Sequence, residues 1–189
     1  EADAFLKALK SILEYTEVSD CRMEQGSLRC DVNISVRKAG QKALGTKVEI
    51  KNLNSFREIR KALEREEKQK QELYRFGEED RILQETRKWD TGKGRTVPMR
   101  SKEDAHDYRY FPEPDLPPVV LDSSMIREIE DGLPELPEQK KERFLRQYGL
   151  NRAETDILAG DKALADYFEE VAGCDIDAGE AANWILVEL

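Results

Sequence analysis

The stretch from Ser27 to Val36 alternates strictly between apolar and polar side chains, and no other pattern constrains the fold as strongly. The apolar members are Leu28, Cys30, Val32, Ile34 and Val36. The polar members between them are Ser27, Arg29, Asp31, Asn33 and Ser35. Because successive side chains of a strand point to opposite faces, this period of two predicts a strand with one buried face and one polar face.

A second alternating segment, Thr46–Lys51, is expected to pair with the first. Val48 and Ile50 share its apolar face. Its polar face carries Lys47, Glu49 and Lys51. Two more strands, Leu83–Trp89 and Thr96–Arg100, are expected to form a hairpin across a glycine-bearing turn. Residues 1–122 therefore predict an α+β fold, an antiparallel sheet with flanking helices.

Two helices are expected beside this sheet. Residues 1–15 carry apolar side chains at the spacing of one helix face. Ser55 and Glu58 fit a capping box that starts a second helix, whose buried stripe would be Phe56, Ile59 and Leu63. Beyond Leu63 this helix is mostly charged to about residue 71, so we expect that end to be solvated.

The chain changes character after Asp122. Residues 1–122 hold 24 basic and 24 acidic residues, whereas residues 123–189 hold 7 and 16. Short helices are expected there, one beginning near Pro137 and ending before Gly149, and others ending at Gly160 and Gly173, with Asp161 as a cap. We predict two domains, an α+β domain over 1–122 and an all-α domain over 123–189. Neither end carries a start or stop signal, so we expect an internal piece of a longer protein.

Composition excludes several classes of protein. No apolar run approaches the about 18 residues that a membrane span requires, so we expect no membrane association. The cysteines, Cys21, Cys30 and Cys174, are odd in number and form no CxxC pair, which favours a reducing, cytoplasmic compartment over a disulfide framework. The acidic second part is unsuited to binding nucleic acid by charge alone, so no DNA partner is expected and tRNA affinity should be weak.

The polar strand faces are the main candidates for a functional site. Arg29, Asp31 and Asn33 in one row would suit a metal–phosphate site, but a solvent-facing strand alternates in the same way. If the two strands pair, Asp31 and Glu49 share one face among basic residues, either as metal ligands or in cross-strand salt bridges. Lys51 to Ser55 leads into a helix N-terminus, which suits either an anion or an ordinary cap.

Other candidates are weaker. Tyr108, Tyr110 and Phe111 surround Arg109 and suit either base stacking or core packing. His106 has no partner pattern and is expected at the surface. The glycine-bearing turn at residues 91–94 lacks the spacing of a phosphate-binding loop, so we interpret it as a hairpin tip.

Several long motifs resemble the B subunit of the tRNA-dependent glutamyl/aspartyl amidotransferase. They are MEQGSLRCDVNIS (23–35), EIKNLNSF (49–56), QETR (84–87) and DYRYFPEPD (107–115). The match is looser beyond residue 122, through LPELP (133–137) and ANW (182–184). Four long motifs in the right order make the resemblance specific.

The resemblance implies an enzyme, a carbon–nitrogen ligase that uses glutamine as nitrogen donor. In this family the B subunit phosphorylates the side-chain carboxylate of Glu-tRNA(Gln) or Asp-tRNA(Asn) with ATP and Mg²⁺. Ammonia from the glutaminase (A) subunit then amidates it. The implied partners are the A subunit, the small C subunit of a heterotrimer and misacylated tRNA. The chain would be the second half of the catalytic cradle plus part of a helical domain, and inactive alone.

The resemblance also implies roles for individual residues. Asp31 and Glu49 correspond to metal ligands, with Asp31 and Arg29 as catalytic residues. The implied cofactor-binding residues are Ser27, Arg29, Lys51 and Asn54. Two other identities stay open, a non-catalytic RNA- or subunit-binding module and an archaeal-type paralogue specialised for glutamine. Convergence of Asp31 and Glu49 on one concave face would favour the enzyme, and the direct run from the PEPD motif into short helices disfavours the paralogue.

Overall fold

The computed structural model describes residues 1–99 and 112–188. The chain forms two compact units, Glu1–Leu6 with Arg22–Pro117 and Lys7–Cys21 with Pro118–Leu189. Helix α1 (Ala2–Tyr15), which the apolar spacing predicts, contributes its first turn to unit 1 and the rest to unit 2. The predicted boundary at residue 122 stays a prediction.

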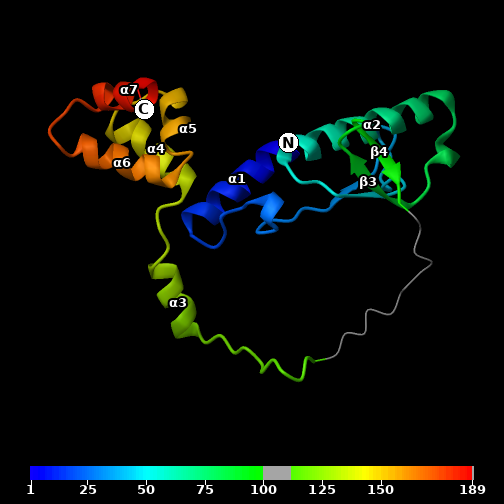
Figure 1. Ribbon diagram of the computed structural model, residues 1–189, viewed down its shortest axis with the longest axis horizontal. Helices are drawn as coiled ribbons and strands as arrows, with labels where there is room; N and C mark the ends of the chain where they lie inside the picture. The colour runs from blue at the N-terminus through cyan, green and yellow to red at the C-terminus, as the bar shows by residue number, and fades with distance from the viewer. Residues whose placement is uncertain (100–111, 189) are drawn as a thin grey trace. The chain divides into compact units, whose positions relative to one another are not determined.

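Unit 1 contains a four-stranded mixed sheet in the order β1-β2-β3-β4, formed by β1 (Val32–Ile34), β2 (Val48–Lys51), β3 (Glu85–Asp90) and β4 (Arg95–Pro98) (Figure 1). The pairs β1–β2 and β3–β4 are antiparallel, but β2–β3 is parallel. The α+β class is confirmed, and the prediction of an antiparallel sheet is wrong at its centre. Helix α2 (Phe56–Phe76) and the 3₁₀ turn η2 (Glu79–Arg81) form a crossover, which is the connection that parallel neighbours require.

Strand β1 is shorter than the alternating stretch that predicts it. Only Val32–Ile34 pair with β2, in the register Val32↔Ile50, Asn33↔Glu49 and Ile34↔Val48. The alternation of burial nevertheless extends upstream, since Cys30 is half-buried while Arg29 and Asp31 are exposed. The face assignment is therefore confirmed over a longer stretch than the hydrogen-bonded strand.

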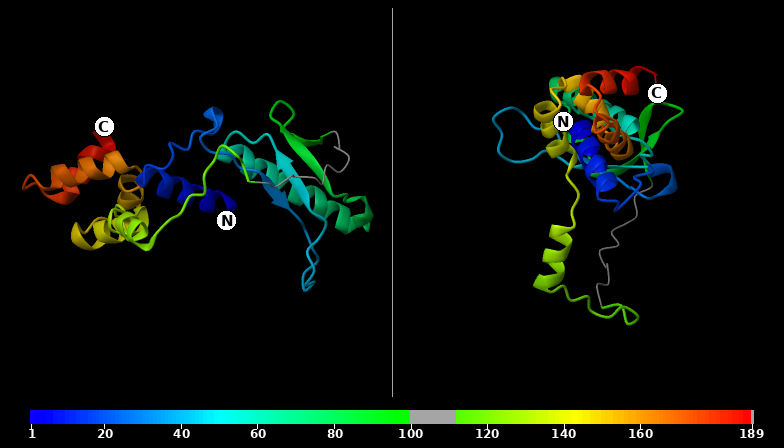
Figure 2. Two further views of the ribbon diagram at one scale, coloured as in Figure 1. Left: turned by 90° about the horizontal axis from the view of Figure 1, so that it is seen from below. Right: turned by 90° about the vertical axis from the view of Figure 1, so that its left-hand side faces the viewer.

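Helix α2 covers one face of this sheet (Figure 1, Figure 2). The core beneath it consists of Leu6, Val32, Ile50, Leu53, Ile59, Ala62 and Trp89. Burial of such side chains contributes about 1.5–3 kcal/mol each. The opposite face of the sheet carries the polar side chains of the alternating strands.

The expectation that α2 is solvated beyond Leu63 holds for most of this stretch, since Glu64, Arg65, Glu67, Lys68 and Gln71 are exposed, but it is wrong at two positions. Glu66 and Lys70 are 2% and 3% exposed. They are buried because Arg87 and Thr96 on the sheet supply charge and hydrogen bonds to Glu66. The side of α2 that faces the sheet thus buries two charged side chains, while the remaining charged side chains stay exposed.

The start of α2 departs slightly from the predicted capping box. The Ser55 hydroxyl accepts from the Glu58 N–H (3.2 Å), as expected. Glu58 reaches back one residue further, so its carboxylate accepts from the Asn54 N–H (3.0 Å). Gly77 ends the helix at φ 70°, a left-handed conformation that suits glycine.

The described part of unit 2 after Pro118 contains five helices: α3 (Ser123–Asp131), α4 (Pro137–Gln147), α5 (Arg152–Leu158), α6 (Lys162–Ala172) and α7 (Ala178–Glu188). Their core is formed by Phe144, Leu150, Leu158, Ala159, Ala165, Phe168, Ala181, Ala182 and Ile185. Pro137 begins α4 and Asp161 caps α6 as predicted, accepting from the Leu164 N–H (2.9 Å). That these helices form a separate all-α domain stays a prediction.

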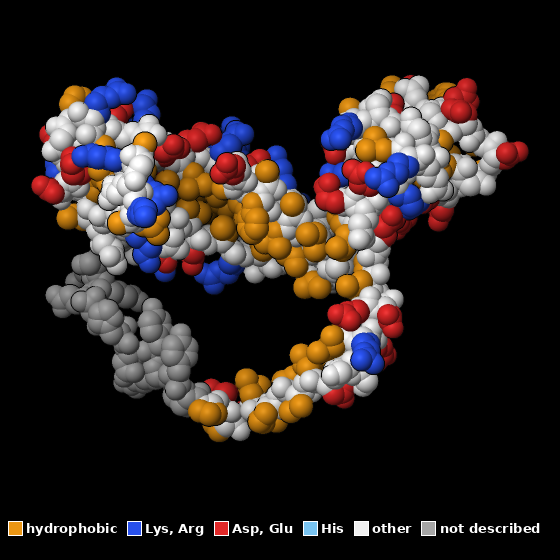
Figure 3. Space-filling view, turned by 180° about the vertical axis from the view of Figure 1, so that it is seen from behind, with side chains coloured by type: hydrophobic (Ala, Val, Ile, Leu, Met, Phe, Trp, Pro, Cys, Tyr) orange, Lys and Arg blue, Asp and Glu red, His pale blue; other side chains and the backbone are white. Residues whose placement is uncertain are grey.

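The segment that leads into α3 and one side of α3 itself carry exposed apolar side chains (Figure 3). They are Val119, Val120, Leu121, Met125, Ile126 and Ile129. No helix within residues 1–99 and 112–188 has the length and apolar character needed to span a membrane.

Candidate functional site

A hollow of about 520 Å³ opens in unit 1 where three segments meet. They are the 3₁₀ turn η1 (Met23–Gln25) with Gly26, the lead-in to β1 and the loop between β2 and α2. Its lining residues are Met23, Glu24, Gln25, Gly26, Leu28, Arg29, Cys30, Asp31, Asn52, Leu53 and Asn54. Three of the six predicted site residues, Arg29, Asp31 and Asn54, therefore border one hollow.

Two left-handed residues shape its walls. Gly26 has φ 80° and closes η1 through its N–H to the Met23 carbonyl (3.1 Å). Asn52 has φ 61°, a conformation that asparagine tolerates, and its side-chain amide donates to the Trp89 carbonyl (3.1 Å). The loop after β2 is thus tied to the end of β3, which holds it against the hollow.

Arg29 and Asp31 are exposed, and neither has a hydrogen-bond or ion-pair partner among the described residues. Between them, Cys30 is half-buried, and burial together with the charge of Asp31 raises the pKa of its thiol. A guanidinium and a carboxylate that have no partner within residues 1–99 and 112–188 thus lie beside one hollow, where they could bind an anion and a cation.

Glu49 and Lys51 lie on the polar face of the sheet and do not line the hollow. The Thr86 hydroxyl donates to Glu49 Oε2 (2.9 Å), and Lys51 Nζ lies 3.5 Å from Glu49 Oε1. Because Asn33 is the register partner of Glu49, Asp31 lies two residues away along the same polar side. The structure thus gives Glu49 an ion pair, and leaves its predicted role as metal ligand untested.

Of the two remaining predicted residues, Asn54 lines the hollow and Ser27 does not. The Ser27 N–H donates to the Arg22 carbonyl (3.1 Å), and Ser27 is exposed. The Asn54 N–H already binds the Glu58 carboxylate, which also accepts from the Thr91 hydroxyl (2.6 Å). The start of α2 is therefore capped by the chain itself, as the simpler of the two interpretations expected.

The glycine-bearing turn at residues 91–94 is a hairpin tip between β3 and β4, as predicted. The Lys93 N–H donates to Asp90 Oδ1 (3.0 Å), and this hydrogen bond lowers the pKa of Asp90. The backbone of this turn is therefore hydrogen-bonded to the carboxylate of Asp90, the last residue of β3.

Within the described residues no three His, Cys, Asp or Glu side chains gather as a metal cluster. Mg²⁺ in phosphate chemistry commonly takes one or two carboxylates, with waters and substrate phosphates completing its shell. Asp31, which has no ion-pair partner in the part of the chain that is described, and Glu49, on the same side of the sheet, fit such a partial ligand set.

A buried ionic cluster beneath the sheet escaped the sequence interpretation. Glu66 forms an ion pair with Arg87 (3.0 Å from Nε to Oε1) and accepts hydrogen bonds from Lys70 and the Thr96 hydroxyl. Arg87 Nε–H donates to the Thr96 hydroxyl (3.2 Å), and Arg87 also pairs with Glu85. Burial raises the pKa of Glu66, but the hydrogen bonds from Lys70 and Thr96 and the charge of Arg87 outweigh it, so the pKa is lowered. The signal was present, since Glu66 and Lys70 are one helical turn apart and Arg87 shares the strand parity of buried Trp89.

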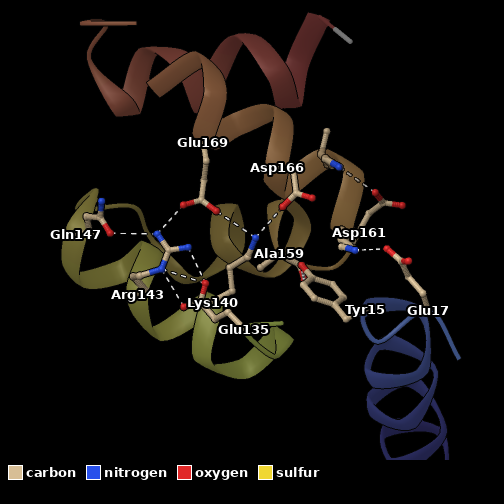
Figure 4. A network of polar contacts seen from close by, with 12 residues as sticks. Tyr15, Glu17, Glu135, Lys140, Arg143, Gln147, Ala159, Asp161, Asp166 and Glu169 are labelled. Carbon is tan, nitrogen blue, oxygen red and sulfur yellow. Dashed lines mark hydrogen bonds and ion pairs between the residues drawn. The ribbon is translucent and has the colours of Figure 1, made fainter. Parts of the chain in front are cut away.

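Unit 2 contains a second ionic network, between α4 and α6 (Figure 4). Lys140 binds Asp166 (2.9 Å) and Glu169 (3.1 Å), and Arg143 binds Glu135 and Glu169 (each 2.6 Å). Burial lowers the pKa of Lys140, but its two carboxylate partners outweigh this and raise it. All of these charges are paired, so the network is suited to holding helices together.

Several predictions lie outside the described residues. They concern His106, Tyr108, Arg109, Tyr110 and Phe111.

Fold and site together define an α+β domain whose sheet has one covered face and one polar face, with two charges beside a hollow that have no partner among the described residues. Residues 1–127 match the GatB/GatE catalytic domain, and the chain belongs to this family.

Three relatives show what the whole chain is similar to. It is 59% identical to the B subunit of the aspartyl/glutamyl-tRNA(Asn/Gln) amidotransferase of Clostridium beijerinckii, over 100% of this chain and 40% of that protein. It is 55% identical to a B subunit of the same amidotransferase, numbered 2, in Clostridium acetobutylicum (100% and 40%). It is 54% identical to the B subunit in Carboxydothermus hydrogenoformans (100% and 39%). The chain spans about 40% of the length of these relatives.

Proposed function

We propose that this chain is part of the amidotransferase subunit that activates tRNA-bound Glu or Asp. The subunit phosphorylates the side-chain carboxylate of Glu-tRNA(Gln) or Asp-tRNA(Asn) with ATP, and ammonia from the glutaminase subunit converts the acyl phosphate to an amide. The names of the relatives and the family match support this assignment. The observation that carries it is a pair of charges, Arg29 and Asp31, that lie beside one hollow of the matched region and have no partner in the described part of the chain.

The charge of each residue determines its proposed role. Arg29 binds phosphate oxygens, because a guanidinium presents several donors in a fixed plane. Asp31 and Glu49 hold Mg²⁺, which when bound supplies positive charge between two anionic substrates. Lys51 and Asn54 contact the nucleotide from the far end of β2 and the start of α2, and Ser27 contacts it from the segment before β1. These groups favour the transition state chiefly through electrostatics and positioning.

The proposal includes the setting of the reaction. The partners are the glutaminase (A) subunit, the small C subunit and misacylated tRNA, in a cytoplasmic heterotrimer. The chain spans about 40% of its relatives, so the remaining part of the protein is needed for activity. The 189 residues alone are therefore expected to be inactive with ATP, ammonium and Glu-tRNA(Gln).

The test is Asp31→Asn in the full-length protein assembled with its partners. Asp31 is exposed and has no partner among the described residues, so its replacement should alter stability by no more than about 0.5 kcal/mol. ATP-dependent amidation should be lost, while basal glutamine hydrolysis at the A subunit continues. Asp131→Asn, at the exposed end of α3, is the matched control. Wild-type amidation by Asp31→Asn would remove Asp31 from the active site.

The alternative, a non-catalytic RNA- or subunit-binding module, is favoured by one observation. Glu49 is paired with Lys51 on the sheet face, and it does not line the hollow that Asp31 borders. The same variant distinguishes the two functions. Under the alternative, Asp31→Asn weakens the binding of tRNA or of a partner protein, while the amidation rate at saturating partner concentrations stays normal.

A further inference from the structure

Thr86 on β3 contacts Glu49 on β2 at the polar face of the sheet. In the parallel register of β2 and β3 it is the direct partner of Glu49. Its hydroxyl donates to Glu49 Oε2 at 2.9 Å. The other carboxylate oxygen, Oε1, lies 3.5 Å from Lys51 Nζ. One oxygen of Glu49 is thus held by a neutral hydroxyl and the other faces a cation.

Thr86 is itself fixed from several sides. Its carbonyl accepts from the Met99 N–H (2.9 Å) beside β4. Its neighbours Glu85 and Arg87 point to the opposite face, where they pair with each other. Arg87 also binds the buried carboxylate of Glu66 on α2 at 3.0 Å. Strand β3 is therefore anchored to the helix directly behind the Thr86 hydroxyl.

An anchored hydroxyl restricts a carboxylate more than water does. A Glu side chain has three rotatable bonds, and ordering it before a ligand arrives removes an entropic penalty from binding. Partners behind a metal ligand orient it, and their loss typically weakens metal affinity or activity by about 10–100-fold.

We infer that Thr86 is a positioning residue for Glu49, with the Glu66–Arg87 ion pair as its support. The inference rests on the proposed function, in which Glu49 contributes to the Mg²⁺ site. Thr86 does not contact substrate in this scheme. It acts through the orientation of the Glu49 carboxylate, so its hydroxyl and not its methyl group carries the effect.

The first experiment uses electron paramagnetic resonance to measure the affinity of the full-length protein for Mn²⁺, a spectroscopic substitute for Mg²⁺. Thr86→Val keeps the shape and strand preference of threonine but removes the donor, and should weaken binding about 10-fold. Thr86→Ser retains a hydroxyl and should stay within about threefold of wild type. Thr46→Val, at an exposed threonine just before β2, is the control and should have no effect. Unchanged Mn²⁺ affinity in Thr86→Val overturns the inference.

A double-mutant cycle distinguishes an effect through Glu49 from a general loss of stability. If Thr86 acts through Glu49, Thr86→Val should add little to the loss caused by Glu49→Gln, because the shared interaction is already gone. Equal effects of Thr86→Val in both backgrounds overturn the inference and leave the proposed function intact. If Glu49→Gln itself binds Mn²⁺ and amidates like wild type, the role of Glu49 in the proposed function fails instead. Amidation measured against Mg²⁺ concentration should show a raised half-saturating concentration for Thr86→Val, with little change in the maximal rate.

Discussion

The charged groups of the two units differ in what they bind. In unit 2, Lys140 pairs with two carboxylates of α6, and Arg143 pairs with one carboxylate of α6 and with Glu135 before α4. In unit 1, Arg29 and Asp31 stand beside the hollow with no partner among the described residues. Paired charges inside a fold satisfy one another, whereas unpaired charges beside a concavity remain available for a ligand.

Unit 1 also contains both arrangements on opposite faces of one sheet. Beneath the sheet, Glu66 has three partners, and above it Asp31 has none in the described chain. The buried face therefore resembles unit 2 in its chemistry, and the polar face does not. If this comparison is correct, substitutions in the paired clusters change stability, and substitutions beside the hollow change activity.

The largest effect on stability is expected from Glu66→Gln. The change leaves Lys70 buried without its carboxylate and Arg87 with Glu85 as its remaining carboxylate partner, which should destabilise unit 1 by about 3–5 kcal/mol. Hydrogen exchange in the full-length protein should accelerate in α2 and β3 and remain unchanged in α4 to α7. Glu67→Gln, at the exposed neighbouring position, is the control. Similar melting temperatures for the two variants would mean that the buried cluster is not stabilising.

The same cluster predicts a pH dependence. The pKa of Glu66 is lowered in the folded state, so the unfolded state binds more protons at acid pH. Its contribution to stability is therefore present above the usual pKa of Glu, about 4.3, and is lost as pH falls through the lower folded value. Glu66→Gln should show a shallower loss of melting temperature than wild type below about pH 4. Parallel acid profiles would contradict the lowered pKa.

A matched pair of arginines tests the comparison directly. Arg29→Met removes an unpaired charge, so stability should be retained while amidation falls roughly 10²–10³-fold. Arg143→Met removes hydrogen bonds to Glu135 and Glu169, and should cost about 1–2 kcal/mol of stability, because the side chain is partly exposed to water. Arg29→Met should thus lower amidation but not the melting temperature, and Arg143→Met should lower the melting temperature. If both variants lose stability equally, the two classes of charge are not distinct.

Local periodicity predicted much of this fold. The alternation from Ser27 identifies which side chains are buried, even upstream of β1, where the chain is not paired with β2. Pro137 and Asp161 mark the starts of α4 and α6 because caps act within one helical turn. Both signals are local in sequence, so they do not depend on how distant parts of the chain fold.

Features that depend on distant residues were not predictable in the same way. The parallel pairing of β2 and β3 depends on the path of the connection through α2 and η2. The alternating pattern within a strand carries no information about that path. The burial of Glu66 depends on Thr96, 30 residues further along. The candidate site mixes both kinds: Arg29 and Asp31 follow from alternation, but the hollow depends on the backbone turns at Gly26 and Asn52.

A smaller effect is expected from Tyr15→Phe in unit 2. Tyr15 is 2% exposed, and its hydroxyl donates to the Ala159 carbonyl (2.9 Å), so its loss should cost about 1 kcal/mol. Burial raises the pKa of Tyr15 to about 12. The raised pKa means that its stabilising effect is complete below about pH 10 and is lost as pH rises towards 12. Tyr15→Phe should therefore lose less stability than wild type between these values, with the exposed Tyr167→Phe as control.

The smallest effect is expected at the ion pair of Glu17 and Lys162. The labelled Glu17 lies at the edge of the network in Figure 4. Glu17 is exposed, so water and salt screen the attraction, and ordering two long side chains opposes it. Its backbone is also left-handed, at φ 58°, which disfavours any side chain. Glu17→Gln should leave the melting temperature unchanged at physiological salt, and Glu17→Gly, which removes the ion pair but suits this backbone, should not lower it. A loss as large as that of Arg143→Met in Glu17→Gln would show that burial does not separate stabilising from incidental pairs here.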